Sequence, residues 1–374
     1  MSKPSETTPF RLLPAHLSAW LMEAGEPTYR ARQIGHWIYR KLVFDPSQMT
    51  NLPAALRASL GGLRGVLPVW PEAEVSSGSG LTRKALLRLE DGDVVEAVLM
   101  VYPARGSGRT RRTVCVSSQA GCAIGCPFCV TGAAGFRRNL TADEIVGQVL
   151  YFARRVRDLE GRDADITNVV LMGQGEPLAN LWEVWRAVEI LNCPEGFGLG
   201  ARHVTISTAG LAPGIRRLAR LPLQIGLAVS LHAPDDALRD RLVPVNRRYP
   251  IAELLDACRE YARQTNRRVS FEYVMISGVN DSPEQADVLA ALLSDLLSHV
   301  NLIPLNRVDG SSFQPSPRSR ILAFQARLRR HGLACSIRAG RGDEIDAACG
   351  QLRARRPRPP SVEEERPYGG RQAS

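Results

Sequence analysis

The sequence predicts an α/β fold: a partial barrel of six βα units, preceded by a small helical N-terminal accessory domain and a β-hairpin linker. Three observations support this prediction. Short apolar runs alternate with helical stretches from residue 113 onward, as in the βαβ units of a parallel sheet. Before residue 70, apolar residues recur at helical spacing. Between these regions, Asp91-Gly92 separates two strand-like runs, which is a hairpin turn signal.

The helical accessory domain is expected over residues 1–80, after a loose tail at residues 1–8. Helical spacing is present in HLSAWLMEAG (16–25) and RARQIGHWIYRKLV (30–43). A third helix is expected near Pro53, because proline is tolerated in a first helical turn.

The β-hairpin linker is expected over residues 81–107. Its two strands are LTRKALLRL (81–89) and VVEAVLMVY (94–102), on either side of Asp91-Gly92. A loop rich in glycine and arginine, from Arg105 to Arg112, then leads into the barrel.

The barrel core is expected over residues 108–342. Six strands are predicted at residues 113–117, 168–172, 203–208, 224–231, 270–276 and 300–304, and a last one at 334–339. Thr141 to Glu144 form a capping box that opens the first helix, and Pro250 and Pro283 open two later helices. Six units do not close an eight-stranded barrel, so ligands are expected at the carboxyl ends of the strands of an open one.

Residues 351–374 differ in composition from the rest of the chain. RARRPRPPSVEEERPYGGRQAS, which begins at residue 353, is rich in proline, arginine and glutamate and has almost no apolar residues. Such a segment cannot bury enough apolar surface to fold, so we predict a disordered tail.

The composition indicates which binding partners and which cellular compartment to expect. Lys and Arg number 48 against 38 Asp and Glu, a formal net charge of +10. This charge favours a polyanion such as RNA or DNA, although a genome that prefers arginine codons would give the same value. Neither an 18-residue apolar run nor a secretion signal is present, so we expect a cytoplasmic protein without a membrane partner. The chain has eight cysteines, and in that compartment metal ligands or redox groups are expected rather than structural disulfides.

The strongest chemical signal is a cysteine loop that follows the first predicted barrel strand. Cys122, Cys126 and Cys129 give the spacing Cys-x3-Cys-x2-Cys. A structural zinc ion would need a fourth ligand, and no Cys or His stands nearby at zinc spacing. Three thiolates on a 4Fe–4S cluster leave one iron open, which can bind a substrate or cofactor.

This loop resembles that of the radical S-adenosylmethionine (SAM) superfamily. The longer sequence resembles the RNA adenine C2-methyltransferase family (RlmN), with its C8-methylating relative Cfr. The shared motifs are VCVSSQAGCAIGCPFC, GFRRNL, MGQGEPLAN, VTISTAG, LAVSLHAPDDALRDRLVPVN, NLIPLN and RGDEIDAACGQL, with YRARQIGHWIYRKLV and MTNLPAALR in the helical part. The resemblance spans nearly everything except the two tails. It implies a radical SAM barrel with one 4Fe–4S cluster and SAM as cofactors.

The resemblance also assigns site residues. The cluster ligands would be Cys122, Cys126 and Cys129. The SAM contacts would be Gly175, Glu176, Ser207, Ser230, Leu231, His232 and Asn306. All of these lie at or just past the carboxyl ends of predicted strands, where the barrel independently places ligands. Gln174 departs from the family, which usually has methionine there.

A second set of cysteines completes the implied mechanism. The resemblance makes residues 343–350 a catalytic segment in which Cys349 receives a methyl group from one SAM. A 5′-deoxyadenosyl radical from a second SAM then takes a hydrogen from that methyl group, and the carbon radical adds to adenine C2. Glu96 would remove the C2 proton, and Cys115 would release the product through a transient disulfide with Cys349. A solvent-facing Glu96 with no catalytic role is the alternative, and Cys193, Cys258 and Cys335 are interpreted as packing residues.

The resemblance implies two RNA substrates. They are an adenine of 23S rRNA in the peptidyl transferase centre and the adenine 3′ of the anticodon in tRNA. Arginines that flank the predicted barrel mouth could neutralise phosphates; they are Arg105, Arg109, Arg111, Arg112, Arg137, Arg138, Arg247, Arg248, Arg338 and Arg341. An electron donor such as flavodoxin and a monomeric state are further expectations.

Three alternatives remain open at this stage. C8 methylation of the Cfr type would share most of these residues. A radical SAM activase acting on a protein would explain the cluster but neither Cys115 and Cys349 nor the basic charge. A non-catalytic RNA-binding or iron–sulfur protein would tolerate replacement of Cys349 and Glu176.

Overall fold

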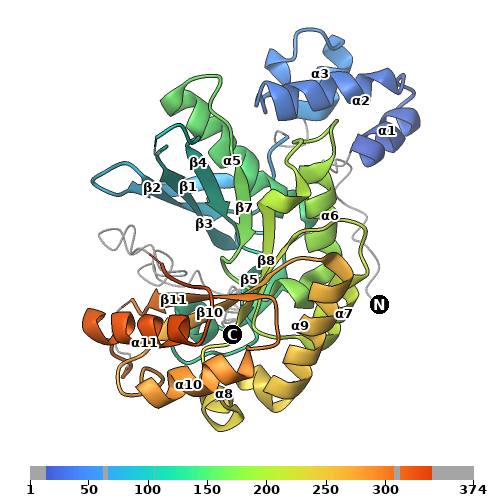
Figure 1. The fold of residues 1–374 in the computed structure, drawn as a ribbon. Coiled ribbons are helices and arrows are strands. Elements are labelled where there is room, and N and C mark those ends of the chain that lie inside the picture. The colour runs from blue at the N-terminus through green and yellow to red at the C-terminus, as the bar shows by residue number, and fades with distance from the viewer. Residues whose placement is uncertain (1–13, 62–65, 105, 307–311, 339–374) are drawn as a thin grey trace, which may run out of the picture.

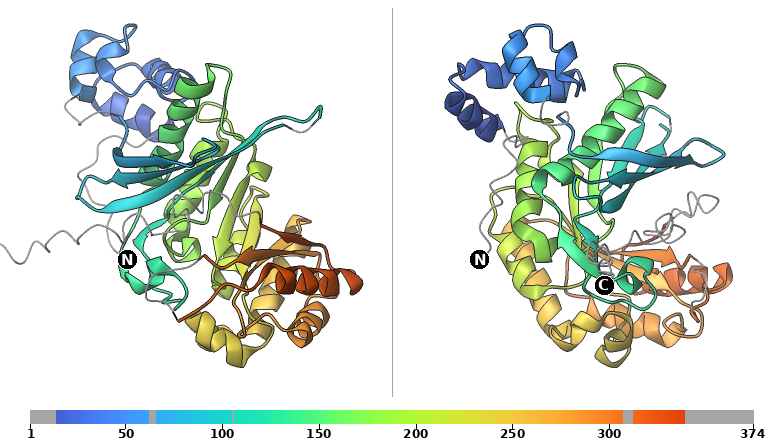
Figure 2. Two further views of the ribbon diagram at one scale, coloured as in Figure 1. Left: turned by 90° about the vertical axis from the view of Figure 1, so that its left-hand side faces the viewer. Right: turned by 180° about the vertical axis from the view of Figure 1, so that it is seen from behind.

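The computed structural model describes residues 14–61, 66–104, 106–306 and 312–338, and its centre is one mixed sheet of ten strands (Figure 1). The strand order is β1-β2-β3-β4-β7-β8-β9-β10-β11-β12. It follows the order along the chain, and β1 and β12 form the two edges, so the barrel is open as predicted. The sheet curves, and helices cover its outer side (Figure 2).

The parallel strands confirm the predicted alternation. They are β4 (Arg111–Cys115), β7 (Asn168–Leu171), β8 (Val204–Thr208), β9 (Gly226–Ser230), β10 (Val269–Met275), β11 (Ser298–Pro304) and β12 (Cys335–Ile337). Each pairs in parallel with the next. Most of their Val, Ile and Leu side chains are buried in one continuous core, which explains the short apolar runs in the sequence.

Helices connect these strands and pack on the outer side of the sheet. They are α5 (Ala142–Glu160), α6 (Leu181–Asn192), α7 (Ala212–Ala219), α8 (Asp236–Leu242), α9 (Ile251–Thr265), α10 (Pro283–Leu292) and α11 (Arg318–Arg330). The predicted capping box of Thr141 and Glu144 is present at α5. The expected starts at Pro250 and Pro283 are confirmed as well, since α9 and α10 begin there.

Three antiparallel strands precede the barrel. The predicted hairpin is confirmed as β2 (Thr82–Arg88) and β3 (Val94–Tyr102), and β3 pairs with β4. An additional strand, β1 (Trp70–Ser76), pairs with β2 at the edge of the sheet. It lies inside the stretch expected to be helical, so the helices end earlier than the boundary at residue 80. β1 could not be predicted from the sequence because it is half-exposed and contains Pro71. An edge strand tolerates proline, but proline is not part of the usual apolar pattern of a strand.

The N-terminal helices form a lobe beside α5 and α6 (Figure 2). They are α1 (Pro14–Glu23), α2 (Tyr29–Gly35), a π-helical turn at His36–Arg40 and α3 (Ala54–Gly61). Arg40 joins the lobe to the barrel, because its guanidinium donates to the Pro194 carbonyl after α6. From α5, Arg157 donates to the carbonyl of Arg40.

Several sequence expectations lie outside the described residues. They are the tail at residues 1–8, the segment at 343–350 with Cys349, and the tail at 351–374. Among the residues that are described, no helix is long and apolar enough to cross a membrane.

Candidate cofactor and catalytic site

The cysteine loop lies between two short strands at the carboxyl end of β4. These strands, β5 (Gln119–Gly121) and β6 (Phe136–Asn139), pair as an antiparallel hairpin, and the short helix α4 (Val130–Ala133) follows the last cysteine. Cys122, Cys126 and Cys129 are half-buried and line one cavity of about 310 Å³. That volume lies within the usual range of small-molecule sites.

The base of the loop closes through a tight backbone contact. The amide of Cys122 donates to the carbonyl of Gly135 at 2.9 Å. Gly121 has a φ of +79°, and a Cβ there would lie 2.0 Å from the Gly135 oxygen. Only glycine fits this position, so the sequence Gly121-Cys122 sets where the first cysteine leaves the strand.

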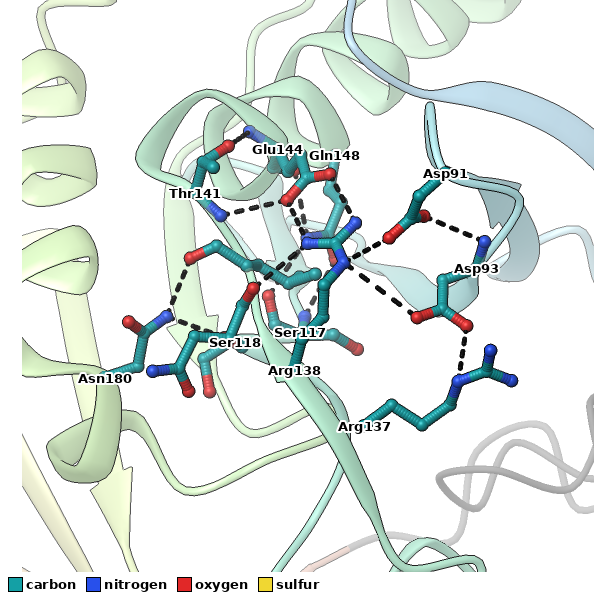
Figure 3. Close-up of polar contacts among 12 residues, drawn as sticks. Asp91, Asp93, Ser117, Ser118, Arg137, Arg138, Thr141, Glu144, Gln148 and Asn180 are labelled. Atoms are coloured by element: carbon teal, nitrogen blue, oxygen red, sulfur yellow. Dashed lines mark hydrogen bonds and ion pairs between the residues drawn. The ribbon is translucent and has the colours of Figure 1, made fainter. Parts of the chain in front are cut away.

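A network of charges anchors the returning strand β6 (Figure 3). Arg138 pairs with both carboxylate oxygens of Glu144 at 2.8 Å, and it also contacts Asp91 in the β2–β3 turn. Arg137 pairs with Asp93 at 2.8 Å. The capping box, the hairpin turn and the cysteine loop are therefore held together by one cluster of ion pairs.

Buried amides fix the other side of the loop. The side chain of Gln148 on α5 exchanges two hydrogen bonds with the backbone of Ser117, at 2.8 and 3.0 Å. The side-chain amide of Asn180 donates to the carbonyls of Ser118 and Leu140, at 2.9 and 2.8 Å (Figure 3). These bonds satisfy backbone groups that leave the ladder where β4 ends.

The segment Gly173-Gln174-Gly175-Glu176 packs directly on this loop. A Cβ at Gly173 would lie 2.7 Å from backbone atoms of Val116, and one at Gly175 would lie 2.5 Å from the Cβ of Gln119. Gln174 is buried, and its Oε1 has no hydrogen-bond partner among the described residues. The two glycines therefore permit a close approach that side chains would prevent.

Glu176 is a buried carboxylate at the cavity wall. Its oxygens accept from the amides of Ala209 at 2.6 Å and Leu178 at 3.0 Å. Burial raises the pKa of Glu176 to about 7, although these hydrogen bonds and one from Thr208 oppose the increase. Such a group can hold a cationic ligand when it is ionised.

The structure brings six of the seven expected SAM contacts to one cavity. They are Gly175, Glu176, Ser207, Ser230, His232 and Asn306. The seventh, Leu231, is fully buried and does not line the cavity. Its backbone amide donates instead to the Glu272 carbonyl at 3.1 Å.

His232 presents a fixed hydrogen-bond donor. Its φ of +60° lies in the left-handed region, which is uncommon for a residue other than glycine. Nδ1 accepts from the Val274 amide at 3.1 Å, and burial together with the nearby Arg239 lowers the pKa of the ring to about 3. The neutral ring therefore carries its proton on Nε2. The ring of Phe128 from the cysteine loop meets it edge to face at 5.1 Å.

The cavity also contains Glu272, which was not predicted from the sequence as a site residue, and Arg338, which was expected only among the arginines at the barrel mouth. Glu272 on β10 is buried, which raises its pKa, and it accepts from Asn301 at 2.9 Å. Arg338 after β12 lines the cavity as well, and it approaches the sulfur of Met100 on β3 at 4.0 Å. Glu272 could have been identified from the sequence, because it is a carboxylate within the otherwise apolar run SFEYVMI.

The three cysteines suit a cluster better than a single ion. Among the described residues, no three His, Cys, Asp or Glu side chains converge closely enough to bind one metal ion. A cubane cluster takes each thiolate on a different iron, so its ligands need not meet at one point. Burial, and then the charges of Cys129 and Cys122, raise the pKa of the Cys126 thiol. Bound iron would compensate this cost.

Cys115 and Glu96 lie on one face of neighbouring strands. Cys115 pairs in register with Val98, two residues from Glu96. Glu96 is 2% exposed and forms an ion pair with the fully buried Lys84, with 3.3 Å between Nζ and Oε1. The alternative of a solvent-facing Glu96 is therefore wrong. Burial raises the pKa of the Cys115 thiol, while Arg338 and Lys84 lower it.

Several of the expected phosphate-binding arginines are bound within the fold. Arg137 and Arg138 form the ion pairs described above, and Arg112 pairs with Glu160. Arg111 lies over the ring of Tyr102, with 4.2 Å to its centroid. Arg105 and Arg341 lie outside the described residues. The remaining cysteines fit packing roles, since Cys258 and Cys335 are buried and Cys193 is half-buried.

Comparison with known families matches two parts of the chain. Residues 116–289 match the family described as "Radical SAM superfamily". Residues 11–64 match the family described as "Ribosomal RNA large subunit methyltransferase N-terminal domain". These ranges correspond to most of the barrel and to the N-terminal lobe.

Similar proteins match the chain over about nine-tenths of its length. A protein from Roseiflexus castenholzii, described as a probable dual-specificity RNA methyltransferase RlmN, is 48% identical over 90% of this chain and 94% of its own length. A Salinispora tropica protein with the same description is 51% identical over 89% of each chain. The crystal structure of a radical SAM methyltransferase from Sphaerobacter thermophilus superimposes with a TM-score of 0.87 at 50% identity, over 93% of this chain and 99% of that one. The chain therefore belongs to the RlmN family of radical SAM enzymes.

Proposed function

We propose that this chain is a dual-specificity RNA methyltransferase that methylates C2 of adenine in 23S rRNA and in tRNA. The rRNA target is in the peptidyl transferase centre, and the tRNA target is the adenine 3′ of the anticodon. The observation that carries the proposal is the cavity in which Cys122, Cys126 and Cys129 face Glu176 and His232, in a chain about 50% identical to proteins described as RlmN.

The cavity residues fit the two cofactors. Cys122, Cys126 and Cys129 would hold one 4Fe–4S cluster with an open iron, which when bound supplies the electron for reductive cleavage of SAM. Glu176 would accept a hydrogen bond from the amino group of SAM, and the backbone of Gly175 would contact the same group. The Nε2–H of His232, the hydroxyls of Ser207 and Ser230 and the amide of Asn306 would hold the rest of the molecule, and Leu231 would act through its backbone.

The remaining residues would act on the methyl group and on the RNA. Cys349 would carry the methyl group that is transferred, and Cys115 would release the product by forming a disulfide with Cys349. Glu96 would remove the C2 proton. The shared face of Glu96 and Cys115, and the contact of Arg338 with Met100 on that sheet, support this assignment because they connect these residues to the cavity.

The partners follow from the same proposal. The RNA must present an adenine outside a helical stack, so an unpaired loop or a flipped base is required. The disulfide must be reduced after each turnover, and the cluster needs an external electron donor such as flavodoxin. We propose a monomer that acts in the cytoplasm.

A strain that lacks its own enzyme tests the proposal. Nucleosides from its rRNA and tRNA are measured by mass spectrometry, with and without this chain. We expect 2-methyladenosine to return in both RNA pools. The appearance of 8-methyladenosine would instead support the Cfr-type reaction. No change in either nucleoside would refute an RNA substrate and favour an activase that acts on a protein.

A further inference from the structure

Arg239 on α8 is a fully buried cation that is hydrogen-bonded to two residues of the cavity wall, Ala209 and Ser230. Its side chain is 0% exposed, and all of its hydrogen-bond acceptors are neutral. Nε donates to the Leu231 carbonyl at 3.1 Å, Nη1 to the Asn246 side-chain oxygen at 2.7 Å, and Nη2 to the carbonyls of Ala209 at 2.6 Å and Ser230 at 3.1 Å. The guanidinium therefore ties the end of β9 to the segment that follows β8.

The surrounding backbone is shaped around this guanidinium. Gly210 has a φ of +115°, and a Cβ there would lie 2.8 Å from Nη2 of Arg239. Ala209 and Ser230 also line the cavity, and the amide of Ala209 donates to Glu176. Arg239 thus acts on the same short segments that form the cavity wall.

The charge of Arg239 is not balanced by a direct contact. In the described part of the chain, no carboxylate lies within ion-pair distance of it. Asp236 and Asp240 reach it only through Asn246, whose amide donates to them at 2.9 and 2.7 Å. Burial lowers the pKa of Arg239 to about 10, and Cys126 is the strongest of the groups that oppose this decrease, ahead of Asp236 and Asp240. The guanidinium is charged at neutral pH.

A buried charge normally requires a partner of opposite sign. A 4Fe–4S cluster with three thiolate ligands is anionic, and its one-electron reduction adds a further negative charge. Given the cluster of the proposed function, we propose that Arg239 is its counter-charge: a positioning residue that favours the reduced cluster and holds both strand ends below it.

Redox titration of the anaerobically reconstituted protein tests this inference. The cluster is titrated without SAM, in mediators poised by an electrode, and the reduced form is measured by electron paramagnetic resonance. Arg239→Met removes the cation, so we expect reduction to become about tenfold less favourable, a shift of about 59 mV to more negative potential for one electron. Asp240→Asn removes a negative charge that acts through Asn246, so we expect a smaller shift in the positive direction.

A matched control separates this effect from net charge. Arg259→Met also removes one positive charge, but Arg259 pairs with Asp256 and Asp295 on the surface, so the potential should not change. If Arg239→Met does not fold, Asp240→Asn still tests the inference, because the sign of its change in reduction potential is predicted. Unchanged potentials in both variants, even with lower thermal stability of Arg239→Met, would show a purely structural role and overturn the inference.

The result is separable from the proposed function. A shifted potential in a protein that methylates no RNA would retain the counter-charge and reject the RNA substrate. A wild-type chain that assembles no cluster would overturn the inference as well as the cofactor assignment. Normal RNA methylation together with unchanged potentials would reject only the counter-charge.

Discussion

Glu176 shows how burial adapts a single carboxyl group to its ligand. Burial raises its pKa to about 7. Two backbone amides donate hydrogen bonds to its carboxylate and fix its orientation. Binding of the SAM ammonium group requires the ionised form. Because the pKa in the ligand-free protein is near 7, the ionised fraction falls about twofold between pH 8 and pH 7 and about fivefold more between pH 7 and pH 6.

We therefore expect SAM affinity to fall as the pH decreases from 8 to 6, with most of the loss below pH 7. Isothermal titration of the reconstituted protein measures this dependence. An analogue without the amino group is the control and should bind with little change over the same range. Equal pH dependence for both ligands would contradict the role of Glu176.

Lys84 and Glu96 form a buried ion pair whose two members depend on each other. Their side chains are 0% and 2% exposed. Replacing one member leaves an uncompensated buried charge, so Lys84→Met should lower the free energy of unfolding by about 3–5 kcal/mol. The double variant Lys84→Met with Glu96→Leu removes both charges and should recover most of that loss.

Urea unfolding of four proteins, the wild type, Lys84→Met, Glu96→Leu and the double variant, measures this coupling. If the double variant is as unstable as the sum of two independent losses, the pair is not coupled as the structure indicates. The same double variant should not methylate adenine C2, because it lacks the carboxylate that would remove the C2 proton.

At the scale of elements, the cysteine loop depends on strand β6 and its anchor. Arg138 connects β6 to α5 and to the β2–β3 turn (Figure 3). Its side chain is 30% exposed, so solvent screens part of the interaction. We expect Arg138→Met to cost about 1–2 kcal/mol of stability and to increase loss of iron from the reconstituted protein.

The control for this variant is Arg154→Met. Arg154 is on α5, the helix that also carries Glu144, and it forms an exposed pair with Asp158 that should be worth about 0.5 kcal/mol or less. It also donates to the Leu42 carbonyl at 3.3 Å, away from the cysteine loop. Iron content after gel filtration and thermal unfolding compare the two variants. Equal iron retention would show that the network does not anchor the loop.

The elements also show what the sequence could predict. The parallel strands were predictable because each contains a short run of Val, Ile or Leu residues whose core-facing side chains are buried. Strand β1 was not, because an edge strand with Pro71 lacks that pattern, and β5 and β6 were missed because they are only 3 and 4 residues long. The Lys84–Glu96 pair could have been inferred from the hairpin register, which places the two charges on one face of an otherwise apolar hairpin.

At the scale of the molecule, the site is assembled from distant parts of the chain. Cys122, Glu176 and Asn306 each follow a different strand and Ser230 ends another, and the sheet brings these carboxyl ends together. Their convergence follows from the fold class and was expected. The burial of Leu231 and the presence of Glu272 in the cavity depend on which way each side chain points, which the predicted strands alone did not determine.

The central claim is that this cavity supports methyl transfer to adenine C2 through Cys349. The most direct measurement uses the reconstituted protein with SAM carrying a deuterated methyl group, a reductant, and tRNA or an rRNA fragment. Mass spectrometry of the digested RNA should show labelled 2-methyladenosine for the wild-type chain and none for Cys122→Ala or Cys349→Ala. Undiminished methylation by Cys349→Ala, or its absence in a wild-type protein that contains its cluster and binds SAM, would contradict the account.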